Sequence, residues 1–315
     1  MFIARPLADR LVRAALLAGA MSLSLFVSGC HQSPSPPATT ASISSAPTTG
    51  RLTAPGLARQ ALADLIAAAG TTHALRVEFT ADTATLTVVV GNSTQAWRWQ
   101  DGTVQAAATD IAYVGQTIFD PQDFALDDLG DLFARAAAQS GSAKGQRLDL
   151  AEYSNHQIFA SVTTTPESHP VFFWWDGSLV AALDFTTTAG LTCGLAELTA
   201  GRSEVMAVGL DQASGGLYAI YRDTNGQIVR GLRMPRLPVH QSAWTATTTD
   251  TGFDPALIDP AALTAVAQQL PELTGRSVSR FGFTIEQRPP ALRPVVYFSV
   301  GGQEIRTTLA GHVVS

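Results

Sequence analysis

The sequence predicts an α+β protein made of four units, each a helix followed by an antiparallel meander, arranged in two duplicated halves. Two recurring marks predict it: glycines that end helical segments, and hairpin turns that contain glycine. Glycine past a helix end adopts the left-handed conformation that closes the last turn, and two-residue hairpins need positive φ at both central residues. The helix-ending glycines are Gly70, Gly141, Gly201 and Gly275, and the turn glycines are Gly102, Gly177, Gly226 and Gly302.

Residues 1–29 are typical of a signal peptide. Arg5, Arg10 and Arg13 form a basic leader, and the uncharged apolar stretch that follows is shorter than the about 20 residues of a membrane-spanning helix. It ends in Val27-Ser28-Gly29-Cys30, which resembles the lipobox of bacterial lipoproteins. The resemblance implies cleavage before Cys30 and acylation of its thiol with palmitate-type chains, which together anchor a protein stably.

The residue after the lipobox cysteine is His31 and not the aspartate that retains lipoproteins at the inner membrane of enteric-type bacteria. The resemblance therefore implies an outer-membrane lipoprotein that faces the periplasm. Residues 30–55 are dominated by Ser, Thr, Pro and Ala, so we expect a flexible tether. With Cys30 acylated, Cys193 has no partner within the chain, and we expect it to be a small buried residue outside any disulfide.

The chain carries 20 basic and 26 acidic residues, for a net charge of −6, and contains no basic run. This composition excludes nucleic acid as an expected partner.

The remaining chain divides into halves of residues 56–185 and 186–315. Successive turn glycines are 75, 49 and 76 residues apart. Because long and short spacings alternate, the simplest account is a pair of units that has been duplicated once.

Each unit reads as helix, strand, strand, tight turn, strand. Two helices share an entry signal, Phe119-Asp120-Pro121 and Phe253-Asp254-Pro255, in which Asp is placed to cap and Pro to begin a helix. After each helix-ending glycine, apolar residues alternate as in a half-buried strand. The alternating residues are Leu75, Val77, Phe79, Leu148, Leu150, Val208, Leu210, Phe281, Phe283 and Ile285.

The stretch from Tyr218 to Ile228, Tyr-Ala-Ile-Tyr-Arg-Asp-Thr-Asn-Gly-Gln-Ile, resembles the PepSY-like and beta-lactamase-inhibitor-like proteins. These are exported bacterial modules in which a helix packs on an antiparallel meander, often in tandem. The resemblance covers architecture and no catalytic residues. It implies inhibition or chaperoning of an exported enzyme.

The sequence contains none of the local motifs of the common hydrolases, metalloenzymes or nucleotide-binding enzymes. Its histidines lie far apart, so we expect no metal site and no cofactor. Cys193 would be a nucleophile only if a histidine reached it in space. An acidic cluster could suggest a cation site, but its position at the start of a helix favours dipole complementation. The cluster comprises Asp120, Asp123, Asp127, Asp128 and Asp131. We therefore expect a protein that is not an enzyme.

Aromatic residues before the turn glycines indicate where a partner binds. Because strand side chains alternate between faces, counting back from each glycine assigns one set to the helix-packed face: Trp97, Trp99, Phe172, Trp174 and Tyr297. The opposite face then carries the candidate partner-binding residues Arg98, Phe173, Trp175 and Phe298. Large aromatics on an uncovered face mark a contact surface, although packing against the other half of the chain would also account for them.

The sequence therefore predicts a lipid-anchored periplasmic protein-binding module. An inhibitor or immunity-type protein that neutralises a secreted toxin, a peptidoglycan hydrolase or another envelope-active enzyme is the leading interpretation. A structural or assembly lipoprotein of an envelope complex is the alternative, and an unrecognised hydrolase is the third.

Overall fold

The computed structural model describes residues 51–165, 169–246, 251–288 and 293–314. Within these ranges, four α-helices and fourteen strands form two antiparallel sheets of seven strands each. The α+β class is therefore confirmed. The signal peptide, the lipobox and residues 30–50 of the predicted tether lie outside the described residues. Residues 51–55, which the sequence assigned to the tether, belong instead to the folded part, since residues 51–53 form a 3-10 helix and Leu52 is fully buried in the first core. No helix in the described ranges is both long enough and apolar enough to cross a membrane.

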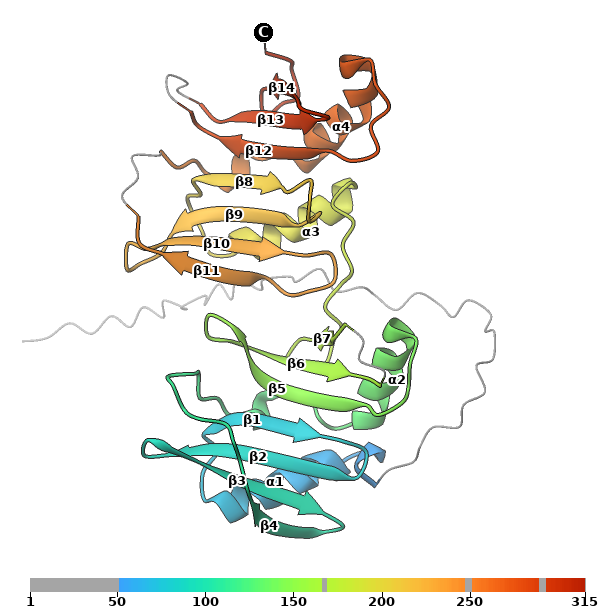
Figure 1. Ribbon diagram of the computed structural model, residues 1–315, viewed down its shortest axis with the longest axis vertical. Coiled ribbons are helices and arrows are strands. Elements are labelled where there is room, and N and C mark those ends of the chain that lie inside the picture. Colours follow the sequence, from blue (N-terminus) through green and yellow to red (C-terminus); the bar gives the residue numbers. More distant parts are fainter. Residues whose placement is uncertain (1–50, 166–168, 247–250, 289–292, 315) are drawn as a thin grey trace, which may run out of the picture.

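The first half contains two helices and seven strands. Its elements are η1 (Arg51–Thr53), α1 (Leu57–Ala69), β1 (Ala74–Phe79), β2 (Thr83–Val90), β3 (Ser93–Gln100), β4 (Thr103–Ala107), η2 (Pro121–Asp123), α2 (Leu129–Ser140), β5 (Arg147–Ser154), β6 (Gln157–Thr163) and β7 (Val171–Phe173). The sheet has the spatial order β4-β3-β2-β1-β5-β6-β7 (Figure 1).

The second half repeats this arrangement. Its elements are α3 (Thr188–Thr199), β8 (Ala207–Leu210), β9 (Leu217–Arg222), β10 (Ile228–Arg233), β11 (His240–Trp244), η3 (Pro255–Leu257), α4 (Pro260–Thr274), β12 (Gly282–Glu286), β13 (Val295–Val300) and β14 (Gln303–Thr307). The sheet order is β11-β10-β9-β8-β12-β13-β14. The two halves share one topology, as a duplication predicts.

Each half consists of a four-stranded unit followed by a three-stranded unit. Helix α1 precedes β1 to β4 and α2 precedes β5 to β7, and the second half repeats this alternation with α3 and α4. The expectation of three strands in every unit is therefore wrong for the first and third units.

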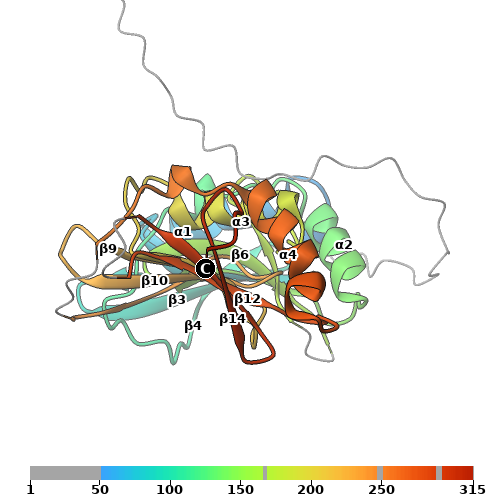
Figure 2. The same cartoon turned by 90° about the horizontal axis from the view of Figure 1, so that it is seen from above.

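The first strands of the two units in each half pair with one another. β1 pairs antiparallel with β5, and β8 pairs antiparallel with β12. The two meanders of a half therefore run outward from this central pair, and both helices cover the same face of the sheet. In both halves the helices lie on the same side of the molecule, which leaves the other face of each sheet without a helix (Figure 2). We refer to this as the helix-free face.

Each half has its own apolar core between helices and sheet. Leu65 of α1 and Val77 of β1 are fully buried in the first core. The second core begins at Ala181 and includes Leu183 and Phe185. The segment that precedes α3 therefore packs with the second half, so the boundary lies a few residues earlier than the sequence suggested.

Three of the helix-ending glycines close their helices as predicted. Gly70, Gly141 and Gly275 are left-handed C-caps with φ of 70°, 77° and 64°. Gly201 instead follows Ala200, which is the C-cap of α3.

The Phe-Asp-Pro signals start short 3-10 helices and not the main helices. Asp120 and Asp254 each accept a hydrogen bond from a backbone N–H two residues later, at the start of η2 and η3. The main helices begin further along, after the caps Asp128 and Asp259. The capping role of Asp120 and Asp254 was predicted correctly. A second aspartate in each segment, Asp128 or Asp259, caps the α-helix that follows.

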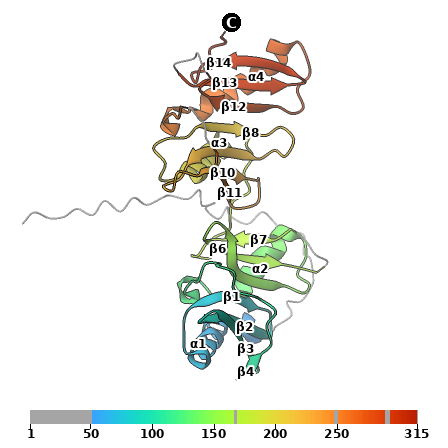
Figure 3. The same cartoon turned by 60° about the vertical axis from the view of Figure 1, so that its left-hand side comes forward.

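The two halves meet where the turn between β5 and β6 reaches β11 (Figure 3). The Ser154 hydroxyl accepts from the Gln241 N–H at 2.8 Å and donates to the Gln241 carbonyl at 3.1 Å. Beside this contact, Phe159 and Phe172 on the helix-free face of the first sheet pack with Leu237 of the second half. Part of the helix-free face of the first sheet therefore packs within the chain, through Phe159 and Phe172. The sequence had assigned Phe172 to the helix-packed face, and that assignment is wrong.

Arg233, at the end of β10, organises the second half's side of the junction. Its side chain is fully buried and makes a 2.6 Å ion pair with Glu197 of α3. It also donates to the carbonyls of Ala181 at 2.7 Å and Leu237 at 2.6 Å. Because a buried guanidinium is stable only when paired and hydrogen-bonded, this side chain fixes the loop that carries Leu237.

Arg233→Ala is expected to lower the free energy of unfolding by about 3–5 kcal/mol, because it leaves Glu197 without its partner in a buried site. Denaturant titration followed by circular dichroism measures this. Arg98→Ala removes an exposed arginine and should change the value by less than about 0.5 kcal/mol. A loss for Arg233→Ala no larger than that of this control would contradict the role of the buried network.

Candidate functional site

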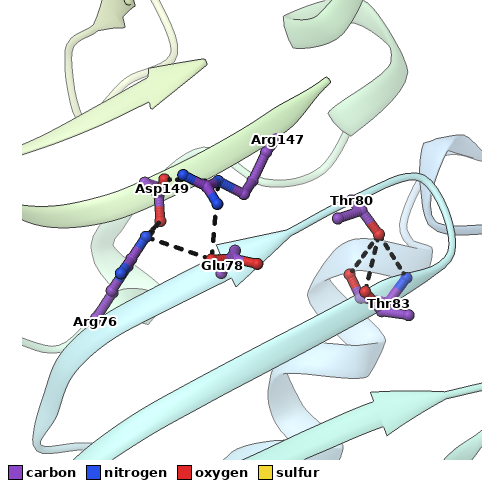
Figure 4. Close-up of polar contacts among 6 residues, drawn as sticks. All are labelled: Arg76, Glu78, Thr80, Thr83, Arg147 and Asp149. Carbon is purple, nitrogen blue, oxygen red and sulfur yellow. Dashed lines mark hydrogen bonds and ion pairs between the residues drawn. The ribbon is translucent and has the colours of Figure 1, made fainter. Parts of the chain in front are cut away.

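The centre of the helix-free face of the first sheet carries a network of ion pairs. The Arg76 guanidinium lies 2.6 Å from the Asp149 carboxylate and 3.3 Å from that of Glu78. Arg147 lies 3.3 Å from Asp149 (Figure 4). These residues lie on β1 and β5 at the centre of the sheet. Because each charge has an opposite partner beside it, the four side chains largely neutralise one another.

The connection of residues 108–118 crosses the same face (Figure 1). The Thr94 hydroxyl donates to the Ile111 carbonyl at 2.6 Å, and the Thr117 N–H donates to the Glu152 carboxylate at 2.7 Å. Burial acts to raise the pKa of Glu152, but the N–H groups of Thr117 and His156 hold that pKa below its ordinary value. Glu152 therefore stays ionised and holds the connection against the sheet.

Two isolated bridges set a residue-by-residue correspondence between the sheets. Ala74 pairs with Phe119 in the first half, and Val205 pairs with Phe253 in the second. Each phenylalanine begins a Phe-Asp-Pro sequence. When the two bridges are superposed, Ala74 corresponds to Val205, and β1 therefore aligns with β8. The pairing of β1 with β5 and of β8 with β12 then aligns β5 with β12. Positions on the two helix-free faces can therefore be compared one by one.

At the centre of the second sheet, small residues replace the ion pairs. The matching positions, first sheet then second, are Arg76 and Ala207, Glu78 and Gly209, Arg147 and Gly282, and Asp149 and Thr284. A Cβ atom at Gly209 would lie 2.5 Å from the Tyr218 hydroxyl, and that hydroxyl lies 3.0 Å from the Thr284 hydroxyl. The Tyr218 side chain therefore lies across the bare backbone of Gly209.

Arginine–tyrosine pairs surround this centre. The Arg230 guanidinium lies 4.9 Å from the centroid of the Tyr218 ring, and that of Arg288 lies 3.9 Å from the Tyr297 ring. Burial acts to lower the pKa of Arg288, but the nearby glutamates hold that pKa above its ordinary value. Trp244, at the end of β11, is 41% exposed. Tyr, Trp and Arg are the residues enriched at the energetic centres of protein interfaces.

The four residues predicted to bind a partner fall into two groups. Arg98 is exposed on the helix-free face of the first sheet, and Trp175 is 65% exposed. Phe173 and Phe298 are each 0% exposed and belong to the first and second cores. The prediction that these two phenylalanines lie on an uncovered face is therefore wrong, and Tyr297 takes the position that had been assigned to Phe298.

The error arises because the turns used for counting are not equivalent. Asp101-Gly102 joins β3 to β4, and Trp99 packs toward the helices as predicted. Gly301-Gly302 joins β13 to β14, the second and third strands of their unit. The loop containing Gly177 has three residues, since the Trp174 N–H bonds to the Ser178 carbonyl. Both differences invert the alternation that was counted from the glycine.

Aspartates of the acidic cluster at the start of α2 make capping hydrogen bonds and ion pairs within the fold. Asp120 and Asp128 cap backbone N–H groups. Asp127 forms a 2.7 Å ion pair with Arg59, whose hydrogen bond lowers the pKa of that carboxyl. Asp131 pairs with an arginine one turn further along α2. In the part of the chain that the structure describes, no group of three or more His, Cys, Asp or Glu is placed to hold a metal ion.

Two of the cavities formed by the described residues lie beside the sheets. One of about 620 Å³ lies between the β8–β9 turn and α4, with Leu210, Pro271 and Phe281 among its lining residues. The other, of about 590 Å³, lies beside the junction, with Phe172 and Arg236 in its lining.

Cys193 departs from the expectation drawn from the sequence. It lies on α3, packs against the second core, and is disulfide-bonded. The prediction that Cys193 stands outside any disulfide is therefore wrong. The other cysteine of the chain, Cys30, lies outside the described residues.

No protein-family model and no curated protein matches the chain. Among solved structures it is similar to sliding clamps. The Helicobacter pylori beta clamp in complex with 5-chloroisatin is 10% identical, with 78% of this chain and 56% of the clamp covered and a TM-score of 0.16. The Pseudomonas aeruginosa DNA polymerase sliding clamp is 10% identical, with coverages of 82% and 63% and a TM-score of 0.15. The chain thus spans less than two thirds of either clamp. At TM-scores this low, the likeness bears on neither the fold nor the function of this chain.

The difference in burial between Phe173 and Trp175 can be tested directly. Phe173→Ala is expected to cost about 3–5 kcal/mol of unfolding free energy because it empties a core site. Trp175→Ala should change stability by less than about 0.5 kcal/mol because its side chain is mostly exposed. Denaturant titration of both variants measures the difference. Equal losses would contradict the placement of Phe173 in the core and of Trp175 in an exposed turn.

Proposed function

We propose that this protein is a lipid-anchored binding protein that holds a protein partner on the helix-free face of the second sheet. The supporting observation is the divergence between the halves. At the centre of the first sheet's helix-free face stand mutually paired charges, and the matching positions of the second sheet carry small residues. These are flanked by Tyr218 and Tyr297, whose stacked arginines are ion-paired with Asp211, Glu286 and Glu304. A face with tyrosine, arginine and the 41% exposed Trp244 matches the composition of interface hot spots.

Within this class we favour an inhibitor or immunity-type protein that neutralises an envelope-active enzyme or toxin. This choice rests on the resemblance of residues 218–228 to the beta-lactamase-inhibitor-like modules. The affinity would come from burial of aromatic side chains and from arginine hydrogen bonds at the face, and no bond-making chemistry is required of the chain.

The lipid anchor at Cys30 completes the proposal. It requires that the Cys193 disulfide be formed with a sulfur other than that of Cys30, because a thioether sulfur cannot form a disulfide. The tether enters the described part of the chain at η1, which packs beside α1 and α2 in the first half. The second half is therefore the part further along the chain from the anchor. We expect the Ser/Thr/Pro-rich tether predicted from the sequence to let this half meet partners away from the lipid surface.

Tyr297→Ala is expected to weaken partner binding by at least about 2 kcal/mol, roughly thirtyfold in affinity, as loss of an interface hot spot does. The measurement is affinity capture by the tagged mature protein from the organism's envelope and secreted fractions, with mass spectrometry of the retained proteins. Ser161→Ala is the matched control, because Ser161 occupies the corresponding position on the first sheet.

A single retained enzyme that loses activity in the complex supports the inhibitor assignment. A retained multi-protein membrane complex would replace it with an assembly role. Capture that Tyr297→Ala leaves unchanged, or that Ser161→Ala reduces equally, would contradict the location of the binding face.

Mass spectrometry of the N-terminal peptide from the native membrane tests the anchor. Lipidation predicts that the mature chain starts at Cys30 with diacylglycerol on its sulfur and an acyl chain on its amino group. A sulfur atom in a thioether cannot also form a disulfide. A lipid-free Cys30 bonded to Cys193 would therefore refute the anchor while leaving the binding face to be judged by capture.

A further inference from the structure

The two sheets have four edge strands, and the fold covers three of them. β7 receives a hydrogen bond from the backbone N–H of Val180 at 2.9 Å, and β14 receives one from Val314 at 2.8 Å. On β11, the Ser154 hydroxyl bonds both backbone groups of Gln241. Natural proteins protect sheet edges in this way because an open edge pairs readily with another strand.

The fourth edge, β4, is uncovered. Among the described residues, no group outside the β3–β4 hairpin is hydrogen-bonded to the backbone of β4. Its sequence from Thr103 to Ala107, Thr-Val-Gln-Ala-Ala, contains no charge and no proline, the usual devices that block an edge. The strand lies at the far end of the first half (Figure 1).

The hairpin geometry determines which backbone groups of β4 point outward. The two-residue turn Asp101-Gly102 places Gln100 opposite Thr103 as the first hydrogen-bonded pair. Because hydrogen-bonded and non-hydrogen-bonded pairs alternate, the N–H and C=O groups of Val104 and Ala106 point away from β3. Two donors and two acceptors therefore face solvent along this edge.

We propose that β4 pairs antiparallel with β4 of a second copy of this chain, with the two Gln105 residues opposite one another at the twofold axis. In this register Val104 of each copy exchanges both backbone hydrogen bonds with Ala106 of the other. The Gln105 side chains, both on the helix-free face, then lie close enough to bond each other.

A second copy fits this edge for two reasons. The strand is self-complementary, since the twofold axis brings uncharged residues onto uncharged residues. The fold also already contains this kind of antiparallel pairing. The first strands of the two units pair antiparallel in each half, β1 with β5 and β8 with β12, and the helices stay on one side of the sheet. A β4 pair would extend one sheet from copy to copy in the same way.

Replacing Gln105 with cysteine in the full-length protein, expressed in its own envelope, tests the pair. Opposed residues of a non-hydrogen-bonded pair have Cβ atoms about 4.5–5.5 Å apart, which mild oxidation can close into a disulfide. We expect the major species of Gln105→Cys on a non-reducing gel to be a dimer whose linked peptide joins the two copies of residue 105.

Thr103→Cys is the matched control. It changes an exposed residue on the same face of the same strand, but its two copies would stand about 13 Å apart along the paired strands, so it should stay monomeric. Adding Ala106→Pro to Gln105→Cys removes an outward N–H without touching the β3–β4 pairing and should abolish the dimer while leaving the circular dichroism unchanged. Absence of the Gln105→Cys dimer, or equal dimer from both cysteine variants, would overturn the proposal.

Discussion

The antiparallel pairing of the first strands, β1 with β5 and β8 with β12, is the constraint on which the rest of the molecule depends. It joins two helix-plus-meander units into one sheet and leaves both helices on the same face. A binding site must then lie on the surfaces that the helices leave uncovered. These remaining surfaces are the helix-free faces and the outer edges, because the helices and sheets bury the other apolar surfaces in two separate cores.

The junction between the halves turns two similar modules into one elongated surface. Arg233 fixes the loop that brings Leu237 against Phe159 and Phe172, and Ser154 occupies the edge of β11. The helices of both halves consequently lie on one side (Figure 2). The two helix-free faces differ. One is held by paired charges and a crossing connection, and the other carries stacked tyrosine and arginine side chains.

The sequence predicted the α+β class, the duplicated halves and most helix ends, because glycines with positive φ leave a local mark. It did not predict which face Phe173 and Phe298 occupy, since turn length and the number of strands per unit decide that alternation. The turn Asn155-His156 was also missed, although both residues have positive φ, because it lacks glycine. The candidate face of the second sheet depends on Gly209 and Thr284 standing where charges stand in the first half, a comparison that requires the strand register.

We propose that the helix-free face of the second sheet, and not that of the first, binds the partner. In-cell photo-crosslinking tests it most directly, with a photoreactive residue placed at Ser299 on the second sheet or at Thr163, its counterpart on the first. A discrete protein adduct is expected from position 299 and none from position 163. An adduct from position 163 alone, or equal adducts from both positions, would contradict it.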